Sequence, residues 1–181
     1  MRNLMTFACP FRRKYPLPSQ KDDLFFMSMA YNEAITAWEE EEVPIGAVIV
    51  REQEVIASAH NLAETRKEAT AHAEILAMAQ ASRFLGDWRL NESILYVTKE
   101  PCPMCAGAAI LSRVGEIVFG FSDEKMGCLG GKLALHQLLT WNHHPRVRFG
   151  IMSEECYELV RVFFEKRRKK DDNISNTTMT H

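Results

Sequence analysis

The order of apolar segments between residues 45 and 121 limits the fold of this chain more than any other feature. Two short runs rich in β-branched residues, 45–50 and 55–60, flank the polar turn Arg51-Glu52-Gln53 and predict a β-hairpin. Helix-forming and strand-forming segments then alternate, at 72–84, 93–98, 103–112 and 116–121. Strands joined by a helix normally run parallel as neighbours in one sheet. The chain is therefore predicted to be an α/β protein.

The remaining segments complete one domain with loosely held ends. Helical spacing of apolar residues predicts a helix over 22–42, ended by Pro44, and a strand and a helix follow at 146–151 and 154–170. We expect a three-layer α/β/α domain over residues 22–170, with a mixed central sheet of about five strands. Residues 1–21 form an N-terminal extension that we expect to be loosely ordered. Residues 171–181 form a polar tail that we expect to be disordered.

Composition excludes several classes of protein. With 181 residues, 46% of them hydrophobic, the chain is long enough for one well-buried core. Its apolar runs are far shorter than the ~18–20 residues that cross a bilayer, so we expect no membrane association. Arg12, Arg13 and Lys14 interrupt the N-terminal apolar stretch, which argues against export. Five cysteines, two of them spaced C-x-x-C, are typical of metal or redox chemistry in a reducing cytoplasm.

Charge is distributed unevenly along the chain. The formal net charge is −2, so no global positive field attracts nucleic acid. Residues 161–170 nevertheless hold six cations against the single acid Glu165. This basic segment is either a solvated helix end that complements the helix dipole or a local contact for nucleic acid.

Two short motifs carry the candidate chemistry, and each opens a predicted helix. They are His72-Ala73-Glu74 and, thirty residues after the histidine, Pro101-Cys102-Pro103-Met104-Cys105. A helix N-terminus lowers the pKa of a cysteine and so makes the thiolate a better metal ligand. His72, Cys102 and Cys105 are three ligands suited to Zn²⁺, and three protein ligands leave the fourth tetrahedral position open for water. This pattern predicts a catalytic zinc site.

Glu74 is the candidate general acid and base of that site. At two residues from His72 it would diverge on a regular helix, but both side chains can face the metal if His72 lies at a non-helical entry. Alternatives exist for each motif alone, since C-x-x-C is also a redox pair or half of a structural zinc site and H-x-E also occurs on surfaces. Cys128 could close a structural site as a fourth ligand, although its Gly-rich loop favours a packing role.

These motifs make the sequence similar to the cytidine deaminase superfamily and, within it, to the bacterial tRNA-specific adenosine deaminases. The resemblance runs from about Leu24 to Arg168. It rests on H-A-E and five further matches, which are E-V-P-I-G-A-V-I-V (Glu42–Val50), Asn61, L-Y-V-T-K-E-P-C-P-M-C-A-G-A (Leu95–Ala108), V-F-G-x-x-D-x-K-x-G (Val118–Gly127) and F-F-x-x-R-R (Phe163–Arg168).

The resemblance implies a cytidine-deaminase-like fold and a zinc-dependent hydrolysis that converts the wobble adenosine of an arginine tRNA to inosine. It implies one Zn²⁺ per subunit on His72, Cys102 and Cys105, a homodimer, and binding of the anticodon stem-loop. The residues implied in proton transfer and substrate binding are Glu74, Asn61, Ala73, Asp123, Lys125, Phe164, Arg167 and Arg168. Ser122 stands where the family has arginine and Met126 where it has threonine, so contacts from this loop to RNA are expected to differ.

Two other functions compete with this interpretation. Guanine and deoxycytidylate deaminases of the same superfamily share H-A-E and P-C-x-x-C, but a small-molecule enzyme has no need of the segment Phe163–Arg168. A zinc-stabilised RNA-binding module without turnover has no need of Glu74. The sequence therefore favours the tRNA deaminase.

Overall fold

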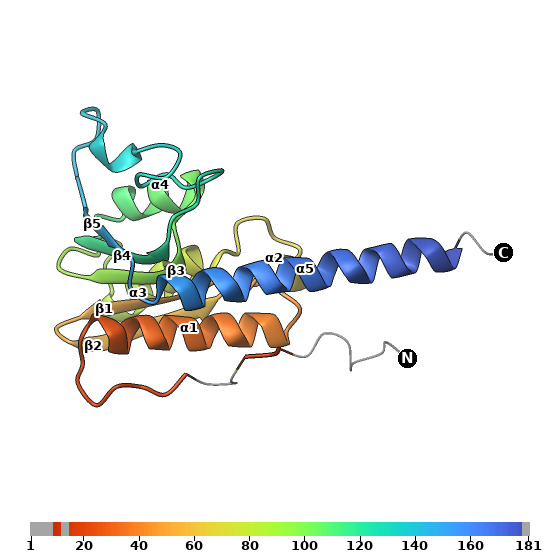
Figure 1. Ribbon diagram of the computed structural model, residues 1–181. Helices are drawn as coiled ribbons and strands as arrows, with labels where there is room; N and C mark the ends of the chain where they lie inside the picture. Colours follow the sequence, from red (N-terminus) through yellow and green to blue (C-terminus); the bar gives the residue numbers. More distant parts are fainter. Residues whose placement is uncertain (1–8, 12–14, 179–181) are drawn as a thin grey trace.

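The computed structural model in Figure 1 describes residues 9–11 and 15–178, without the side chains of 171–178. Its elements are α1 (Asp23–Glu39), β1 (Gly46–Arg51), β2 (Glu54–His60), α2 (Ala63–Arg66), α3 (Ala73–Leu85), β3 (Ile94–Lys99), α4 (Pro103–Leu111), β4 (Glu116–Phe121), the 3₁₀ turn η2 (Leu135–Gln137), β5 (Arg146–Phe149) and α5 (Ser153–Thr178). The structure thus confirms the predicted hairpin and the alternation of helices and strands after it.

Within the described residues, the strands form one mixed sheet in the order β2-β1-β3-β4-β5. β1 pairs antiparallel with both β2 and β3, whereas β3, β4 and β5 are parallel. The expectation of parallel neighbours is therefore right for β3 and β4 but wrong for β2 and β3, because β1 lies between them. The reason is burial: β1 is buried over residues 46–50 and suits an interior position, while β2 has only two buried residues and lies at the edge.

Helices cover both faces of this sheet and give the predicted three layers. α3 and α4 pack on one face, around Ala77, Leu95 and Ile117. α1 and α5 pack on the other, where they lie side by side in Figure 1 and where the rings of Trp38 and Phe163 meet edge to face at 5.1 Å. Two apolar cores of this kind hold the helix starts in fixed positions relative to the sheet.

Two local features place α1 and α3. Asp22 caps α1, because its side chain accepts a hydrogen bond from the backbone N–H of Phe25 at 3.0 Å. A Cβ at Gly46 would lie 2.0 Å from the carbonyl oxygen of Ala30, so only glycine lets α1 approach β1 this closely. α3 ends as predicted at Gly86, which adopts the left-handed conformation.

The chain ends differ in part from expectation. α5 continues to Thr178, beyond the predicted end at 170, because the polar residues 171–178 include no glycine or proline to stop a helix. In the N-terminal extension, the backbone N–H of Tyr15 donates to the side chain of Asn32, whose Nδ2 donates to the Tyr15 carbonyl at 3.2 Å. Residues 1–8, 12–14 and 179–181 lie outside the described part, including Arg12, Arg13 and Lys14.

None of the helices in the described part of the chain is long and apolar enough to span a membrane.

Candidate active site

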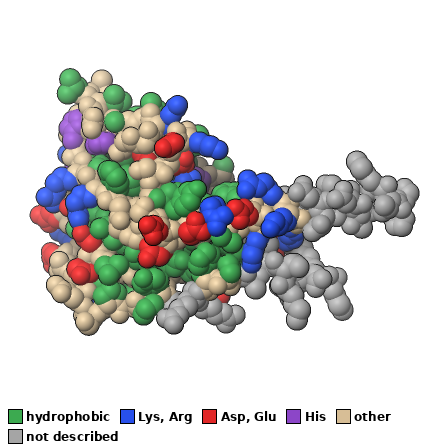
Figure 2. All heavy atoms as spheres, viewed as in Figure 1, with side chains coloured by type: hydrophobic (Ala, Val, Ile, Leu, Met, Phe, Trp, Pro, Cys, Tyr) green, Lys and Arg blue, Asp and Glu red, His purple; other side chains and the backbone are tan. Residues whose placement is uncertain are grey.

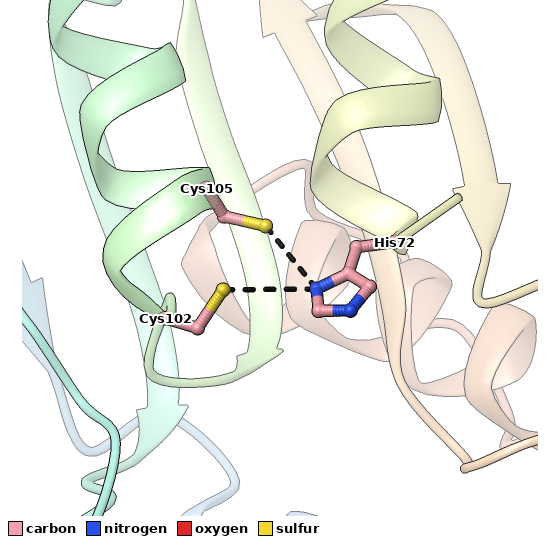
Figure 3. Close-up of side chains that lie close together, drawn as sticks. All are labelled: His72, Cys102 and Cys105. Atoms are coloured by element: carbon pink, nitrogen blue, oxygen red, sulfur yellow. Dashed lines mark hydrogen bonds between the residues drawn. The ribbon is translucent and has the colours of Figure 1, made fainter. Parts of the chain in front are cut away.

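Three potential metal ligands converge at the starts of α3 and α4 (Figure 3). His72 and Cys102 are the N-cap residues of these helices, both in extended conformation, and Cys105 lies in the first turn of α4. The Nδ1 atom of His72 lies 3.7 Å from Sγ of Cys102 and 3.4 Å from Sγ of Cys105. Motifs thirty residues apart in the chain therefore present their donor atoms to one point.

The donor set fits a zinc ion. In a tetrahedral site with Zn–N and Zn–S bonds of about 2.0–2.3 Å, the ligand atoms lie roughly 3.5–3.8 Å apart. The two measured separations are close to these values, and all three donor atoms lie within 4.8 Å of one another. Two sulfurs and one imidazole nitrogen are also the ligand types that zinc prefers. Three protein ligands match the catalytic rather than the structural pattern.

Neighbouring groups favour the thiolate at Cys102. Hydrogen bonds from Cys105 and His72 lower the pKa of Cys102 to about 4, although burial opposes the shift. The same hydrogen bond from Cys105, together with burial, raises the pKa of the Cys105 thiol. The hydrogen bond to Cys102 raises the pKa of His72. A divalent metal bound at this group would favour the thiolate form of both cysteines, because its charge offsets their mutual repulsion.

Glu74 is the buried acid beside this group. It lies in the first turn of α3, and the residue is only 4% exposed. Burial raises the pKa of the Glu74 carboxyl above its usual range. His72 and Glu74 are only two residues apart and would point in different directions on a regular helix. Because the backbone of His72 is extended, both residues line the same cavity. A carboxyl with a raised pKa is suited to accepting and returning a proton near neutral pH.

A cavity of about 250 Å³ opens in front of these residues. Of the site residues expected from the sequence, it is lined by Asn61, His72, Glu74, Cys102, Asp123 and Phe164. Val43, Ile45 and Ala63 add apolar wall, and Met126 closes the side formed by the loop after β4. A cavity of this size, with apolar walls and a few polar groups, is typical of a site for a small planar ligand or a single nucleobase.

The other residues expected to bind substrate do not line the cavity. Ala73 is fully buried as the first residue of α3. Lys125 and Arg168 are exposed, and Arg167 forms a surface ion pair with Glu64 at 3.6 Å. Figure 2 shows Lys and Arg side chains gathered around the part of α5 that leaves the body of the molecule.

The Asp123 side chain stabilises the loop after β4 through its contacts with Lys99 and the loop backbone. Its carboxylate pairs with Lys99 at 2.7 Å and accepts the backbone N–H of Lys125 at 2.9 Å. Partial burial opposes ionisation, but the hydrogen bonds from Lys99 and the loop hold the pKa of Asp123 below its usual range. Lys99, which also lines the cavity, was not among the residues predicted from the sequence.

Sequence reasoning also missed the roles of two buried glutamates, Glu42 and Glu100. The Glu100 carboxylate accepts three backbone N–H groups, from Asp123, Leu129 and Gly131, each at 2.8 Å. It thereby fixes the loop that forms one wall of the cavity. The sequence signal for Glu100 was its position between a buried strand and the P-C-P-M-C motif. An acidic residue at such a position is rarely buried without hydrogen-bond partners.

Cys128 packs into the core and is not one of the grouped ligands. It is 1% exposed among residues of the α3–α4 core, and its backbone N–H donates to the carbonyl of Pro101 at 3.0 Å. Within the described residues, the group with metal-binding geometry comprises His72, Cys102 and Cys105 alone.

Comparison with known proteins agrees with this geometry. The family model of MafB19-like deaminases matches residues 21–168. By fold and site, the chain is therefore a deaminase with the cytidine-deaminase-like α/β architecture. The tRNA-specific adenosine deaminase of Bacillus subtilis is 50% identical over 148 residues, covering 82% of this chain and 92% of the relative. The Haemophilus influenzae protein of the same name is 41% identical over 130 residues, covering 71% and 75%. The chain belongs to the tRNA-specific adenosine deaminase family, and it is an enzyme.

Solved structures show the same relationship. A tRNA:A34 deaminase, described in work on A-to-I editing at the wobble position, is 40% identical with a TM-score of 0.72, covering 74% of this chain and 97% of that one. Guanine deaminase from Bacillus subtilis is 34% identical with a TM-score of 0.54, covering 56% and 65%.

Proposed function

We propose that this enzyme, with one Zn²⁺ per subunit held by His72, Cys102 and Cys105, converts the wobble adenosine of an arginine tRNA to inosine. The observation that carries the proposal is the convergence of these three ligands with the buried carboxyl of Glu74 on one cavity, in a chain of this family. Metal ligands alone would support a structural site, but the adjacent carboxyl supports turnover.

Glu74 is the proton carrier of the proposed reaction. Zinc held by this donor set supplies a Lewis acid that makes water a nucleophile near neutral pH. Glu74 accepts the proton that water loses as its oxygen bonds to C6 of adenine, and it delivers that proton to N1. It then transfers the second water proton to the exocyclic nitrogen. The C6–N bond breaks, ammonia leaves and inosine remains. Burial, which raises the pKa of Glu74, favours both directions of this transfer.

The surrounding residues hold the base and the RNA. Asn61 hydrogen-bonds the adenine, and the backbone of Ala73 approaches the base from the start of α3. Asp123 and Lys125 lie beside the flanking nucleotides, and Phe164, Arg167 and Arg168 meet the RNA from α5. Nucleotides of an anticodon loop are already partly unstacked, so inserting one base into the cavity costs less than flipping a base from a duplex. We further propose that the enzyme acts in the cytoplasm as a homodimer.

Guanine deamination is the second candidate, because a guanine deaminase shares the fold at 34% identity. The cations around α5 favour the RNA substrate, since a free base gains nothing from them.

The test is a comparison of substrates. Zinc-loaded protein is incubated separately with an arginine-tRNA anticodon stem-loop, with guanine and with deoxycytidylate, and Glu74→Ala serves as the control. We expect inosine from the stem-loop only and none with Glu74→Ala. Turnover of guanine or deoxycytidylate without inosine would reject the proposal.

A further inference from the structure

Glu42 is a fully buried acid whose contacts lead to the cavity. It lies between the end of α1 and β1, and its side chain is 0% exposed. Its Oε2 accepts Nδ2 of Asn61 at 3.0 Å and the backbone N–H of Glu64 at 3.1 Å, while Oε1 accepts the backbone N–H of Thr65 at 2.6 Å. Three donors thus surround one carboxyl group on the side of the cavity that Asn61 and Ala63 line.

The backbone on both sides of the Glu42–Asn61 contact is held by other bonds. The N–H of Glu42 donates to the carbonyl of Ala37 at 2.9 Å, and the N–H of Asn61 donates to the carbonyl of Ile45 at 3.0 Å. These bonds do not restrict the side-chain amide of Asn61. The contact with Glu42 therefore restricts the orientation of the amide itself.

An asparagine amide has a donor end and an acceptor end, and rotation by 180° exchanges them. The oxygens of Glu42 act only as acceptors here, so the nitrogen of Asn61 must face Glu42. One N–H is then occupied, and Oδ1 and the second N–H of Asn61 remain for a ligand in the cavity. Reversal of the amide would place its carbonyl against Glu42, where two acceptors repel each other.

We propose that Glu42 is a positioning residue that fixes the amide orientation of Asn61 and thereby the hydrogen-bond pattern offered to the purine. The inference rests on the proposed function, in which Asn61 is the residue that binds the base. Hydrogen bonds from a fixed amide discriminate between purines more strongly than apolar contacts do, since a mismatched base leaves a buried polar group unpaired. Glu42 also anchors the segment after Asn61 through its bonds to Glu64 and Thr65.

A double-mutant cycle separates positioning from simple support of the fold. The variants are Glu42→Gln, Asn61→Ala and the combination, assayed for kcat/KM with the stem-loop and for thermal unfolding. If Glu42 acts through Asn61, Glu42→Gln lowers kcat/KM by about tenfold in the parent and by less than about twofold in the Asn61→Ala background. Equal losses of kcat/KM in both backgrounds would overturn the proposal. Glu42→Asp, whose carboxylate is one methylene too short to keep the 3.0 Å contact with Asn61, replaces Glu42→Gln if the latter does not fold, and it should show the same dependence on residue 61.

Glu116→Gln is the matched control. Glu116, the first residue of β4, is also a buried glutamate, 6% exposed, but its partners are Arg146 and Arg148 of β5. This variant should lower thermal stability and leave kcat/KM unchanged with either residue at position 61. A drop in kcat/KM as large as that of Glu42→Gln would show that any buried glutamate has this effect, and would overturn the proposal.

A second readout requires no substrate. In ¹⁵N-labelled protein, the side-chain N–H of Asn61 that bonds to Glu42 should exchange slowly with water, and Glu42→Leu, which has no acceptor, should remove this protection. Unchanged exchange and chemical shift in the variant would overturn the positioning role. A parent protein that makes no inosine, but shows the protected Asn61 amide, would instead reject the proposed function and leave the role of Glu42 supported.

Discussion

The side chain of Glu74 combines burial with a place beside the three candidate ligands, and its role can be separated from theirs. Glu74→Ala should retain zinc, because the carboxyl is not one of the converging donors. Deamination should fall by at least about 10⁴-fold, the upper range for a general acid or base, because the group acts twice in each cycle. Metal analysis and single-turnover inosine formation check both parts. Loss of zinc together with activity would show that Glu74 is a ligand.

Cys102 and Cys128 offer a direct comparison between a ligand and a core cysteine. Cys102→Ser should lose zinc and activity together, since a serine hydroxyl stays protonated near neutral pH and does not replace the thiolate. Cys128→Ser should keep stoichiometric zinc, because Cys128 packs in the core outside the ligand group. Zinc content, measured by atomic absorption, distinguishes a ligand from a core cysteine. Retention in Cys102→Ser, or loss in Cys128→Ser, would contradict the ligand set.

The three candidate metal ligands could be found in the sequence because they stand in two short motifs at helix starts. In the structure, the donor atoms of His72, Cys102 and Cys105 lie within 4.8 Å of one another. Glu42 and Glu100 were not predictable in the same way. Their roles depend on backbone N–H groups that are distant in the chain, and no local pattern specifies which loop N–H groups will face a carboxylate.

At the level of elements, the loop after β4 depends on close approach to Glu100. A Cβ at Gly131 would lie 2.3 Å from Oε2 of Glu100 and 2.6 Å from the carbonyl oxygen of Asp123. Gly131→Ala should therefore displace this loop, lower the stability by about 1–3 kcal/mol and reduce deamination. Gly107→Ala is the control, because no atom lies within 4 Å of the new Cβ, and alanine in α4 should stabilise by about 0.5–1 kcal/mol. Urea unfolding measures both changes, and equal stabilities of the two variants would contradict the account of this loop.

The contact between α1 and the end of β2 should make stability depend on pH. Nδ1 of His60 lies 3.0 Å from Glu33 and Nε2 lies 3.3 Å from Glu40, and the hydrogen bond with Glu33 raises the pKa of His60. A raised pKa means that the stabilisation is fully present below the usual value of about 6.5 and is lost as pH rises through the folded-state pKa. The free energy of unfolding of the parent relative to His60→Gln should thus decrease as pH rises above 6.5. Urea unfolding from pH 6 to 9 measures it, and a difference that does not change with pH would contradict the assignment.

Most elements were predictable from the spacing of apolar residues, but the order of the strands was not. β1 lies between β2 and β3 because its buried residues need cover on both faces, and this choice depends on the complete sheet. The end of α5 was missed for a different reason. Polar composition at 171–178 indicates exposure, but it does not by itself end a helix.

For the whole molecule, the cations around α5 should govern binding of tRNA and leave the chemical step unchanged. Arg167→Ala combined with Arg168→Ala removes two charges that can neutralise phosphates. The affinity for tRNA should fall, and the slope of log K against log salt should become shallower by roughly one to two units. Single-turnover deamination at saturating tRNA should stay within a few-fold of the parent.

The charge-matched control for this variant is Arg83→Ala, in the last turn of α3, combined with Arg89→Ala, in the segment between α3 and β3. Both arginines are exposed, so the pair removes the same charge at a distance from the proposed RNA path. Its salt slope should match that of the parent. Equal slopes for all three proteins would contradict a role of α5 in binding RNA.

The central claim is that this chain deaminates a tRNA adenosine by hydrolysis, and one labelling experiment tests it directly. Zinc-loaded protein is incubated with total tRNA in H₂¹⁸O, and the product nucleosides are located by sequencing and weighed by mass spectrometry. The account predicts inosine at the wobble position of an arginine tRNA, carrying one solvent oxygen, with the parent and not with Glu74→Ala. Absence of inosine with fully zinc-loaded parent protein, or inosine without solvent oxygen, would contradict it.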